Sequence, residues 1–291
     1  MKIVAFIPAR YHSTRFKGKP LAMIAGKPMI QHVYERAKGC PELDEIYVAT
    51  DDLSIYQCVT GFGGHAIMTD KSHQSGTDRI AEAAEKINLD DHDIVVNIQG
   101  DQPTFQPSVI ADLIKPLMQD STIPMSTLMY QIKDEKERHD TNHIKVVVDS
   151  KGYALYFSRL SIPFHRDQGS TTIHYKHLGI YAYRKKFLLI FTKLPYGVLE
   201  KAEKLEQLRA LEHGFKIKVV ETIFDSTEVD TPEDIKIVEG KISKKSALVN
   251  STRALSVVRG CRYLNYSVLF SPNFFLGKSI LWHKHPRHGL K

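Results

Sequence analysis

The alternation of strand-like and helix-like segments from residue 2 to about residue 120 most constrains how this chain can fold. Strands are expected at Ile3–Phe6, Glu45–Ala49, His65–Met68 and Asp93–Ile98. Between them, helices are expected at Met29–Lys38, Leu53–Val59 and Arg79–Ile87. Regular alternation of this kind is typical of a parallel sheet with helices on both faces. The pattern therefore predicts an α/β fold built on a mostly parallel, doubly wound sheet.

The second half of the chain predicts a mixed α/β region. Strands are expected at Ser126–Gln131, Lys145–Asp149, Tyr153–Phe157, His174–Tyr183 and Lys216–Val220. Leucines at spacing three within charged sequence predict one helix over Leu199–Glu212. A last helix is expected to start at Thr231, with Pro232 at its first position. Because no long linker interrupts residues 1–245, we expect them to form one domain.

The net charge of +7 comes from residues 246–291, which contain seven basic residues and no acidic one. Without those seven, 33 of the 40 basic residues remain, against 33 acidic residues. Residues 1–245 are therefore neutral, which argues against nucleic-acid binding by the main domain. We expect residues 246–291 to be a poorly ordered basic extension. A nucleic-acid-binding role for its basic and aromatic residues is the non-enzyme alternative.

Composition also bounds the cellular setting. No run of about 18 apolar residues is present, so no transmembrane helix is expected. The first residues enter a strand directly and do not resemble a signal peptide. Three cysteines with no close spacing favour a reducing compartment and give no zinc signature. These features predict a cytoplasmic protein.

A basic loop follows the first strand, with Arg10, Arg15, Lys17 and Lys19 beside Gly18. Open α/β sheets bind ligands at the carboxyl ends of their strands. Arginine and lysine suit phosphate oxygens, and glycine lets the backbone approach a ligand. The loop predicts a cradle for a nucleotide triphosphate. Taken by itself, it is equally consistent with a solvated loop that closes against acidic neighbours.

Two acidic residues are candidates for a metal site at the same sheet edge. Asp101 directly follows the fourth strand, and Asp230 precedes the last helix. Two carboxylates together with nucleotide phosphates would suit Mg²⁺, which prefers oxygen ligands. Taken singly, Asp101 also fits a turn in the sequence GDQP, and Asp230 fits a favourable anion near a helix start.

Seven segments, in this order, together resemble one enzyme family. They are IPARYHSTRFKGKPL, HQSGTDR, VNIQGDQP, YALYFSR, HLGIYAYR, KLEQLR and VDTPEDI. Over residues 2 to about 240 the chain resembles the 3-deoxy-manno-octulosonate (Kdo) cytidylyltransferases, also called CMP-Kdo synthetases. These enzymes join CTP to the sugar acid Kdo, giving CMP-Kdo and pyrophosphate for lipopolysaccharide biosynthesis. The basic extension has no counterpart in the family.

The resemblance implies a nucleotide-diphospho-sugar transferase fold, a Mg²⁺ requirement and a cytoplasmic homodimer. It implies a sugar-binding and dimerisation part at roughly residues 125–215. It implies that CTP is bound by Arg10, Arg15, Lys19, Ser75 and Arg79, and that Asp101 and Asp230 hold Mg²⁺. Catalysis would rest on Arg15, Lys19, Asp101 and Asp230. Contacts to the sugar acid would come from Gln99, Arg159, Arg166, His177, Glu206 and Gln207.

The identity of the acceptor sugar is open at this point. Gln102 stands where many family members have Glu. The segments GDQP, HVYER and IPF-R resemble the branch that activates 8-amino-3,8-dideoxy-manno-octulosonate. In contrast, His73-Gln74 resembles the ordinary Kdo branch. A sialic-acid-activating enzyme is a more distant alternative, because it shares the first loop but not the YALYFSR and HLGIYAYR segments. A dinucleotide-dependent dehydrogenase is disfavoured because no G-x-G-x-x-G follows the first strand.

Overall fold

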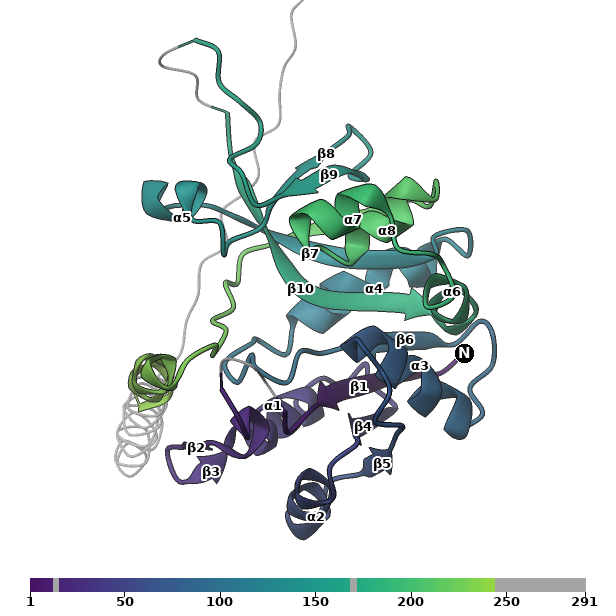
Figure 1. Ribbon diagram of the computed structural model, residues 1–291. Helices are drawn as coiled ribbons and strands as arrows, with labels where there is room; N and C mark the ends of the chain where they lie inside the picture. Colours follow the sequence, from purple (N-terminus) through teal and green to yellow (C-terminus); the bar gives the residue numbers. More distant parts are fainter. Residues whose placement is uncertain (13–15, 168–171, 244–291) are drawn as a thin grey trace, which may run out of the picture. The chain divides into compact units, whose positions relative to one another are not determined.

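The structure is a computed structural model that describes residues 1–12, 16–167 and 172–243. The predicted extension at 246–291 lies outside the described residues. Within them, a nine-stranded sheet forms the centre of the fold, with helices on both sides (Figure 1). Its strands are β1 (Ile3–Ala9), β4 (Glu45–Thr50), β5 (Ala66–Met68), β6 (Ile94–Asn97), β7 (Met125–Gln131), β8 (Lys145–Val148), β9 (Ala154–Ser158), β10 (Tyr175–Arg184) and β11 (Ile217–Thr222).

The sheet runs in the order β11-β7-β10-β6-β1-β4-β5. β1 pairs in parallel with β4 and β6, and β4 pairs in parallel with β5. β10 lies antiparallel between β6 and β7, and β8 and β9 extend from it. The predicted α/β fold with a mostly parallel sheet is thus confirmed. Parallel pairing brings the carboxyl ends of β1 and β6 to the same edge of the sheet.

Helices cover both faces of this sheet and bury two separate apolar clusters. The helices are α1 (Met29–Lys38), α2 (Leu53–Gly61), α3 (Gly76–Lys86), α4 (Val109–Gln119), α5 (Glu135–His139), α6 (Lys185–Phe191), α7 (Val198–Glu203) and α8 (Gln207–Glu212). Side chains alternate along β1, so Ala5 and Ile7 pack with α1, α2 and α4. Val4 and Phe6 face the other way and pack with α3, α6 and α8. This burial on both faces explains the continuous apolar run of β1.

The helix predicted over Leu199–Glu212 is wrong in one respect, because the chain breaks there into α7 and α8. Lys204 adopts a left-handed conformation, with φ of 54°, and ends α7. The Glu212 carboxylate accepts hydrogen bonds from the backbone N–H groups of Leu199 and Glu200, which folds α7 against α8. Leu205 and Leu208 are both buried despite the break. Their spacing therefore indicated which residues face the core, but it could not reveal the turn.

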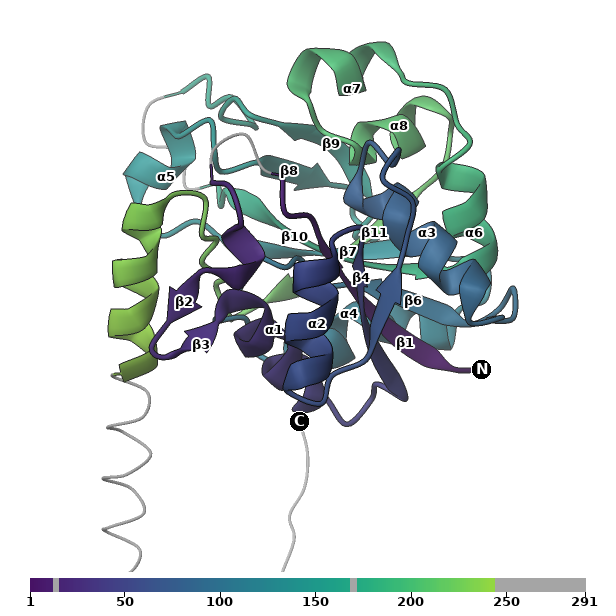
Figure 2. The ribbon, with the colours of Figure 1, turned by 60° about the horizontal axis from the view of Figure 1, so that its bottom comes forward.

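Residues 232–243 form the predicted last helix, and a small hairpin lies beside it (Figure 2). The hairpin is formed by β2 (Met23–Ile24) and β3 (Lys27–Pro28), which follow the short 3₁₀ helix η1 (Lys19–Leu21). Glu239 accepts a hydrogen bond from the Ala25 backbone at 2.9 Å, and Val238 packs against Ile24. These contacts join the last helix to the region that follows the basic loop. None of the helices in the described ranges is long and apolar enough to span a bilayer.

Candidate active site

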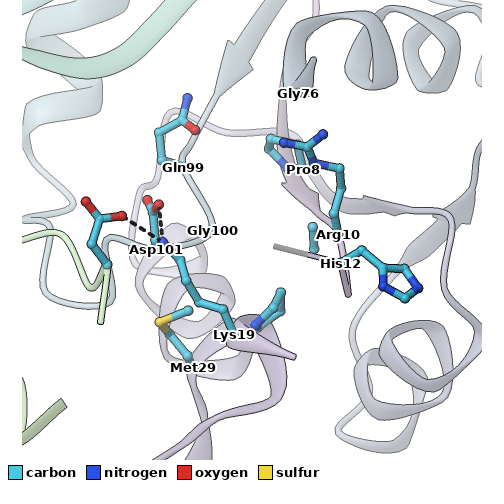
Figure 3. Close-up of a pocket in the computed structure, with 12 residues that line it drawn as sticks. Pro8, Arg10, His12, Lys19, Met29, Gly76, Gln99, Gly100 and Asp101 are labelled. Atoms are coloured by element: carbon cyan, nitrogen blue, oxygen red, sulfur yellow. Dashed lines mark hydrogen bonds and ion pairs between the residues drawn. The ribbon is translucent and has the colours of Figure 1, made fainter. Parts of the chain in front are cut away.

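A cavity of about 250 Å³ opens where β1 and β6 end, and it collects residues from four distant parts of the chain (Figure 3). The lining residues are Pro8, Ala9, Arg10, His12, Lys19, Pro20, Met29, Gly76, Gln99, Gly100, Asp101 and Asp230. Five residues predicted to bind substrate or metal are therefore brought together: Arg10, Lys19, Gln99, Asp101 and Asp230. Arg10 and Lys19 approach the cavity from different sides.

Lys19 joins the two candidate metal-binding carboxylates. Its Nζ atom donates to Asp101 Oδ2 at 2.8 Å and to Asp230 Oδ1 at 3.3 Å. The Lys19 side chain is 14% exposed, so this contact lies at the base of the cavity and not on the open surface. Gly18 precedes η1 in the left-handed conformation, with φ of 70°. That conformation favours glycine and turns the chain into the 3₁₀ helix that carries Lys19.

The loop that carries Asp101 is held against β1 and α1. A Cβ atom on Gly100 would lie 2.9 Å from the Pro8 carbonyl oxygen, so only glycine lets these two loops approach so closely. Arg36 of α1 donates from Nε to the Pro103 carbonyl at 2.6 Å and from Nη1 to the Phe105 carbonyl at 3.1 Å. The position of Asp101 is therefore set by packing on both sides of its loop.

Asp230 is held beside Asp101 by backbone contacts. The Val229 N–H donates to the Asp101 carbonyl at 2.9 Å, which joins the two segments directly. Asp234 Oδ2 accepts from the backbone N–H groups of Asp230 at 2.9 Å and Thr231 at 2.8 Å. This capping arrangement fixes the turn before the last helix and directs the Asp230 side chain into the cavity.

The donor set fits Mg²⁺ shared with a nucleotide. Within the described part of the chain, no group of three or more His, Cys, Asp or Glu side chains could hold a metal ion. Two carboxylates do converge, and a cation, the Lys19 ammonium, already bridges them. Mg²⁺ is commonly held by one or two carboxylates, with substrate phosphates and waters as the remaining ligands. The pair therefore suits a metal that arrives with a triphosphate.

Arg10, Ser75 and Arg15, all predicted to contact CTP, have different surroundings. Arg10 is exposed, and its Nη1 donates to the Gln74 carbonyl at 3.3 Å. Ser75 caps α3, accepting from the Asp78 N–H at 3.0 Å, directly before the cavity-lining Gly76. Arg15 lies outside the described residues, so its contact with CTP stays a prediction.

The prediction that Arg79 lines the cytidine side needs correction, because this side chain is fully buried. Its Nη1 donates to Thr69 Oγ1 at 2.5 Å, and its Nη2 donates to Asp51 Oδ2 at 2.9 Å. These contacts tie α3 to the segments after β4 and β5. The resemblance of QSGTDR to the family implied this contact, and a motif does not report whether a side chain is buried.

Most residues predicted to contact the sugar acid surround β9, β10 and the break between α7 and α8. Gln99 donates to the Gly179 carbonyl of β10 at 3.0 Å. His177 of β10 contacts Thr127 Oγ1 at 2.9 Å and lies edge-on to Phe157 of β9. Burial lowers the pKa of His177 to about 3, so its ring is neutral at physiological pH. A neutral imidazole both donates and accepts, as contact with a hydroxyl requires.

Glu206 lies in the break itself and reaches across to α3. Thr77 Oγ1 donates to Glu206 Oε2 at 2.5 Å. Burial raises the pKa of the Glu206 carboxyl, while hydrogen bonds from the Thr77 and Ser75 hydroxyls act in the opposite direction. Gln207 is 5% exposed at the start of α8. Its side chain is therefore in the interior of this conformation, unlike that of Glu206, which is 30% exposed.

The two arginines predicted to contact the sugar acid differ. Arg159 follows β9 and is held by two carbonyl groups, with Nε 2.7 Å from the Glu203 oxygen and Nη1 3.0 Å from the Thr141 oxygen. Carbonyl contacts leave its positive charge available for a carboxylate ligand. Arg166 is exposed in the segment between β9 and β10. The contact with Glu203 thus ties Arg159 to the end of α7, next to the break that holds Glu206. The contacts of Arg159 and Arg166 with the sugar acid stay predictions.

Sequence reasoning missed Glu228, a third acidic side chain beside the cavity. Gln102 Nε2 donates to Glu228 Oε1 at 3.1 Å. Another part of Glu228 is exposed to solvent. Partial burial of its carboxyl group raises the pKa of Glu228, and the charges of Asp101 and Asp230 raise that pKa further. The available signal was that Glu228 lies only two residues before Asp230 in the sequence.

Comparison with known proteins shows the family of this chain. Residues 4–234 match the cytidylyltransferase family. The chain is 56% identical over 234 residues to 3-deoxy-manno-octulosonate cytidylyltransferase of Syntrophus aciditrophicus, covering 80% of this chain and 94% of that protein. It is 54% identical over 244 residues to 8-amino-3,8-dideoxy-manno-octulosonate cytidylyltransferase of Shewanella pealeana, covering 84% and 99%.

Solved structures agree with the sequence comparisons. CMP:2-keto-3-deoxy-manno-octonic acid synthetase complexed with CTP superposes with a TM-score of 0.80 at 42% identity, covering 84% of this chain and 100% of that one. The 4-diphosphocytidyl-2C-methyl-D-erythritol synthase of Anaerococcus prevotii has a TM-score of 0.55 at 16% identity, which shows a shared fold alone. The resemblance found in the sequence is confirmed, and the chain belongs to the 3-deoxy-manno-octulosonate cytidylyltransferase family.

Proposed function

We propose that this protein transfers CMP from CTP to the eight-carbon sugar acid Kdo, releasing pyrophosphate, as a step of lipopolysaccharide biosynthesis. The observation that carries the proposal is the convergence of Lys19, Asp101 and Asp230 in one cavity. Cations and paired carboxylates at one sheet edge suit a triphosphate with its metal. The relatives named above act on CTP and on Kdo or its 8-amino analogue, which supports the same assignment.

The reaction is an attack of the anomeric C2 hydroxyl of the sugar on the α-phosphorus of CTP. The new oxygen–phosphorus bond forms as the bond to the leaving pyrophosphate breaks, and the hydroxyl proton is released. Arg10 and Lys19, together with Arg15, would hold the phosphates and neutralise the charge that develops on pyrophosphate. Phosphoryl-type transfer depends largely on such positioning and charge neutralisation.

Asp101 and Asp230 are the residues that would hold Mg²⁺. When bound, the ion would supply charge neutralisation at the phosphate oxygens and favour deprotonation of the attacking hydroxyl. Lys19 contacts both carboxylates in the absence of a ligand. If Asp101 and Asp230 held the ion, the Lys19 ammonium would be available to bind the phosphates.

The sugar acid would lie against β9, β10 and the α7–α8 break. The Arg159 guanidinium suits its carboxylate, because carbonyl oxygens orient it without neutralising it. Glu206, Gln99 and neutral His177 offer the mixed acceptors and donors that hydroxyl groups require. Gln207 and Arg166 belong to this proposal only if the region rearranges around the ligand.

A test of the proposal is pyrophosphate release from CTP and Mg²⁺ with three acceptors assayed in parallel: Kdo, 8-amino-3,8-dideoxy-manno-octulosonate and sialic acid. We expect Kdo to give the highest kcat/KM and sialic acid to give no release above background. Absence of release with both eight-carbon acids would contradict the proposed function.

The 8-amino analogue is the second candidate acceptor, because a relative named for that substrate is 54% identical in sequence to this chain. Gln102, which is buried and donates to Glu228, is one of the residues at which the chain resembles that branch. A higher kcat/KM with the 8-amino acid in the same assay would reassign the substrate while keeping the reaction.

The proposal includes a homodimer in the cytoplasm, where CTP is made. Three large apolar residues on β9 and the segment after it are exposed: Leu155 at 62%, Leu160 at 70% and Phe164 at 87%. Exposed apolar groups of this kind commonly mark an interface between subunits. Sedimentation equilibrium is expected to give twice the mass of the chain, and a monomer at micromolar concentration would contradict the dimer.

A further inference from the structure

The first turn of α3 contacts both halves of the candidate site. Gly76, the first residue of α3, lines the cavity proposed for the nucleotide. Thr77, the next residue, is 3% exposed and donates its hydroxyl to Glu206 at 2.5 Å. Glu206 is 129 residues further along the chain and belongs to the proposed sugar-binding region. One hydrogen bond therefore joins the nucleotide side to the sugar side.

The Glu206 carboxylate has few other supports. Its Oε1 atom is buried and has no hydrogen-bond partner among the described residues. Arg209 forms an ion pair with Glu206, but its Nη2 lies 3.9 Å from Oε1, beyond hydrogen-bonding distance. Arg209 is already committed to Glu200, with contacts of 2.8 Å and 2.6 Å, and to the Tyr196 ring. Orientation of Glu206 thus depends on the hydroxyl groups at the start of α3.

The direction of the hydrogen bond defines what Glu206 can do. A carboxylate accepts through both oxygens, so Oε2 can take the Thr77 proton and still accept from a ligand hydroxyl. The Glu206 side chain is 30% exposed, which leaves it accessible to a ligand. Without the Thr77 hydroxyl, the carboxylate would lose its shortest contact and could rotate away.

We propose that Thr77 is a positioning residue, whose hydroxyl orients the Glu206 carboxylate to receive a hydroxyl group of the sugar acid. This inference rests on the proposed function, which assigns Glu206 to that substrate. It makes sugar binding depend on the same turn of α3 against which the nucleotide lies. The position of the two substrates relative to each other is thereby set partly by one side chain that touches neither.

The test is steady-state kinetics of Thr77→Val, with CTP and the sugar acid varied separately. Valine keeps the shape of threonine but removes the donor. We expect the KM for the sugar acid to rise about tenfold, with kcat and the KM for CTP changed by less than about twofold. Thr77→Ser, which restores the hydroxyl, should recover most of the loss. Thr192→Val is the matched control. The Thr192 hydroxyl, directly after α6, donates to the Leu189 carbonyl of that helix, so its removal should change neither KM.

A double-mutant cycle separates positioning from general support of the helix. In a Glu206→Gln background, Thr77→Val should raise the KM for the sugar acid by less than about twofold, because the oriented carboxylate is already gone. An equal rise in both KM values, or full additivity with Glu206→Gln, would overturn the inference. Thermal unfolding checks that each variant folds, and Thr77→Ala replaces valine if it does not.

The outcomes also distinguish this inference from the function on which it rests. If the wild-type protein releases no pyrophosphate with either eight-carbon acid, the proposed function fails. If the wild-type protein does release pyrophosphate and Thr77→Val leaves the KM for the sugar acid unchanged, only the role of Thr77 is wrong.

Discussion

Replacing Asp101 with Asn should lower kcat/KM for pyrophosphate release by about 1,000-fold while leaving the fold intact. Asparagine keeps the shape of the side chain but removes the negative charge that pairs with Lys19 at 2.8 Å. The loss follows because the remaining carboxylate, Asp230, would have to hold the metal alone. Asp101 is on a loop and its side chain is 27% exposed, so little stability depends on it. Circular dichroism and thermal unfolding check the fold, and the pyrophosphate-release assay measures the rate.

The matched control for Asp101 is Asp91→Asn. Asp91 also pairs with a lysine, Lys185, at 3.4 Å, but neither residue lines the cavity. This variant should keep kcat/KM within about twofold of the wild type, since it removes only a surface ion pair. If Asp101→Asn retained near-normal activity, Asp101 would not belong to the metal site.

Replacing Arg79 with Met should lower the free energy of unfolding by about 3 kcal/mol, because it removes one partner of a buried ion pair. The buried guanidinium donates to Asp51 and Thr69, and both would lose that donor. The folded variant should keep its KM for CTP within about twofold, because the side chain does not reach the cavity. Urea denaturation measures the first quantity, and steady-state kinetics measures the second.

Lys86→Met is the matched control for Arg79, because it removes a cation from the same helix at an exposed position. Lys86 pairs with Glu82 at 2.7 Å and its side chain is 48% exposed. Its loss should cost less than about 1 kcal/mol. The correction to Arg79 would itself be wrong if Arg79→Met unfolded like the wild type but raised the KM for CTP tenfold or more.

The sequence predicted those parts of the molecule that depend on local pattern. The apolar run of β1 was readable because burial on both faces of a sheet affects neighbouring residues in the same way. Convergence of Lys19 with Asp101 was predictable from topology, since parallel strands end at one sheet edge. The roles of the sugar-side residues came from family resemblance and not from spacing.

The remaining features depend on contacts between distant segments. The left-handed turn at Lys204 is stabilised by Glu212 reaching Leu199 and Glu200, which no periodicity reveals. Arg79 was assigned to CTP from its motif, and a motif does not show whether an arginine side chain is buried or faces a ligand. The Thr77–Glu206 hydrogen bond joins residues 129 positions apart and needed coordinates to be seen.

The central claim is that Asp101 and Asp230 hold a metal ion against the triphosphate of CTP. A crystal structure of this protein with CTP and Mg²⁺ tests it most directly. We expect an oxygen of each carboxylate at about 2.1 Å from one Mg²⁺ that also contacts a phosphate oxygen. In that complex the Lys19 ammonium should have left the carboxylates for the phosphates. A metal held by phosphates and water alone, with Lys19 still bridging Asp101 and Asp230, would contradict the account.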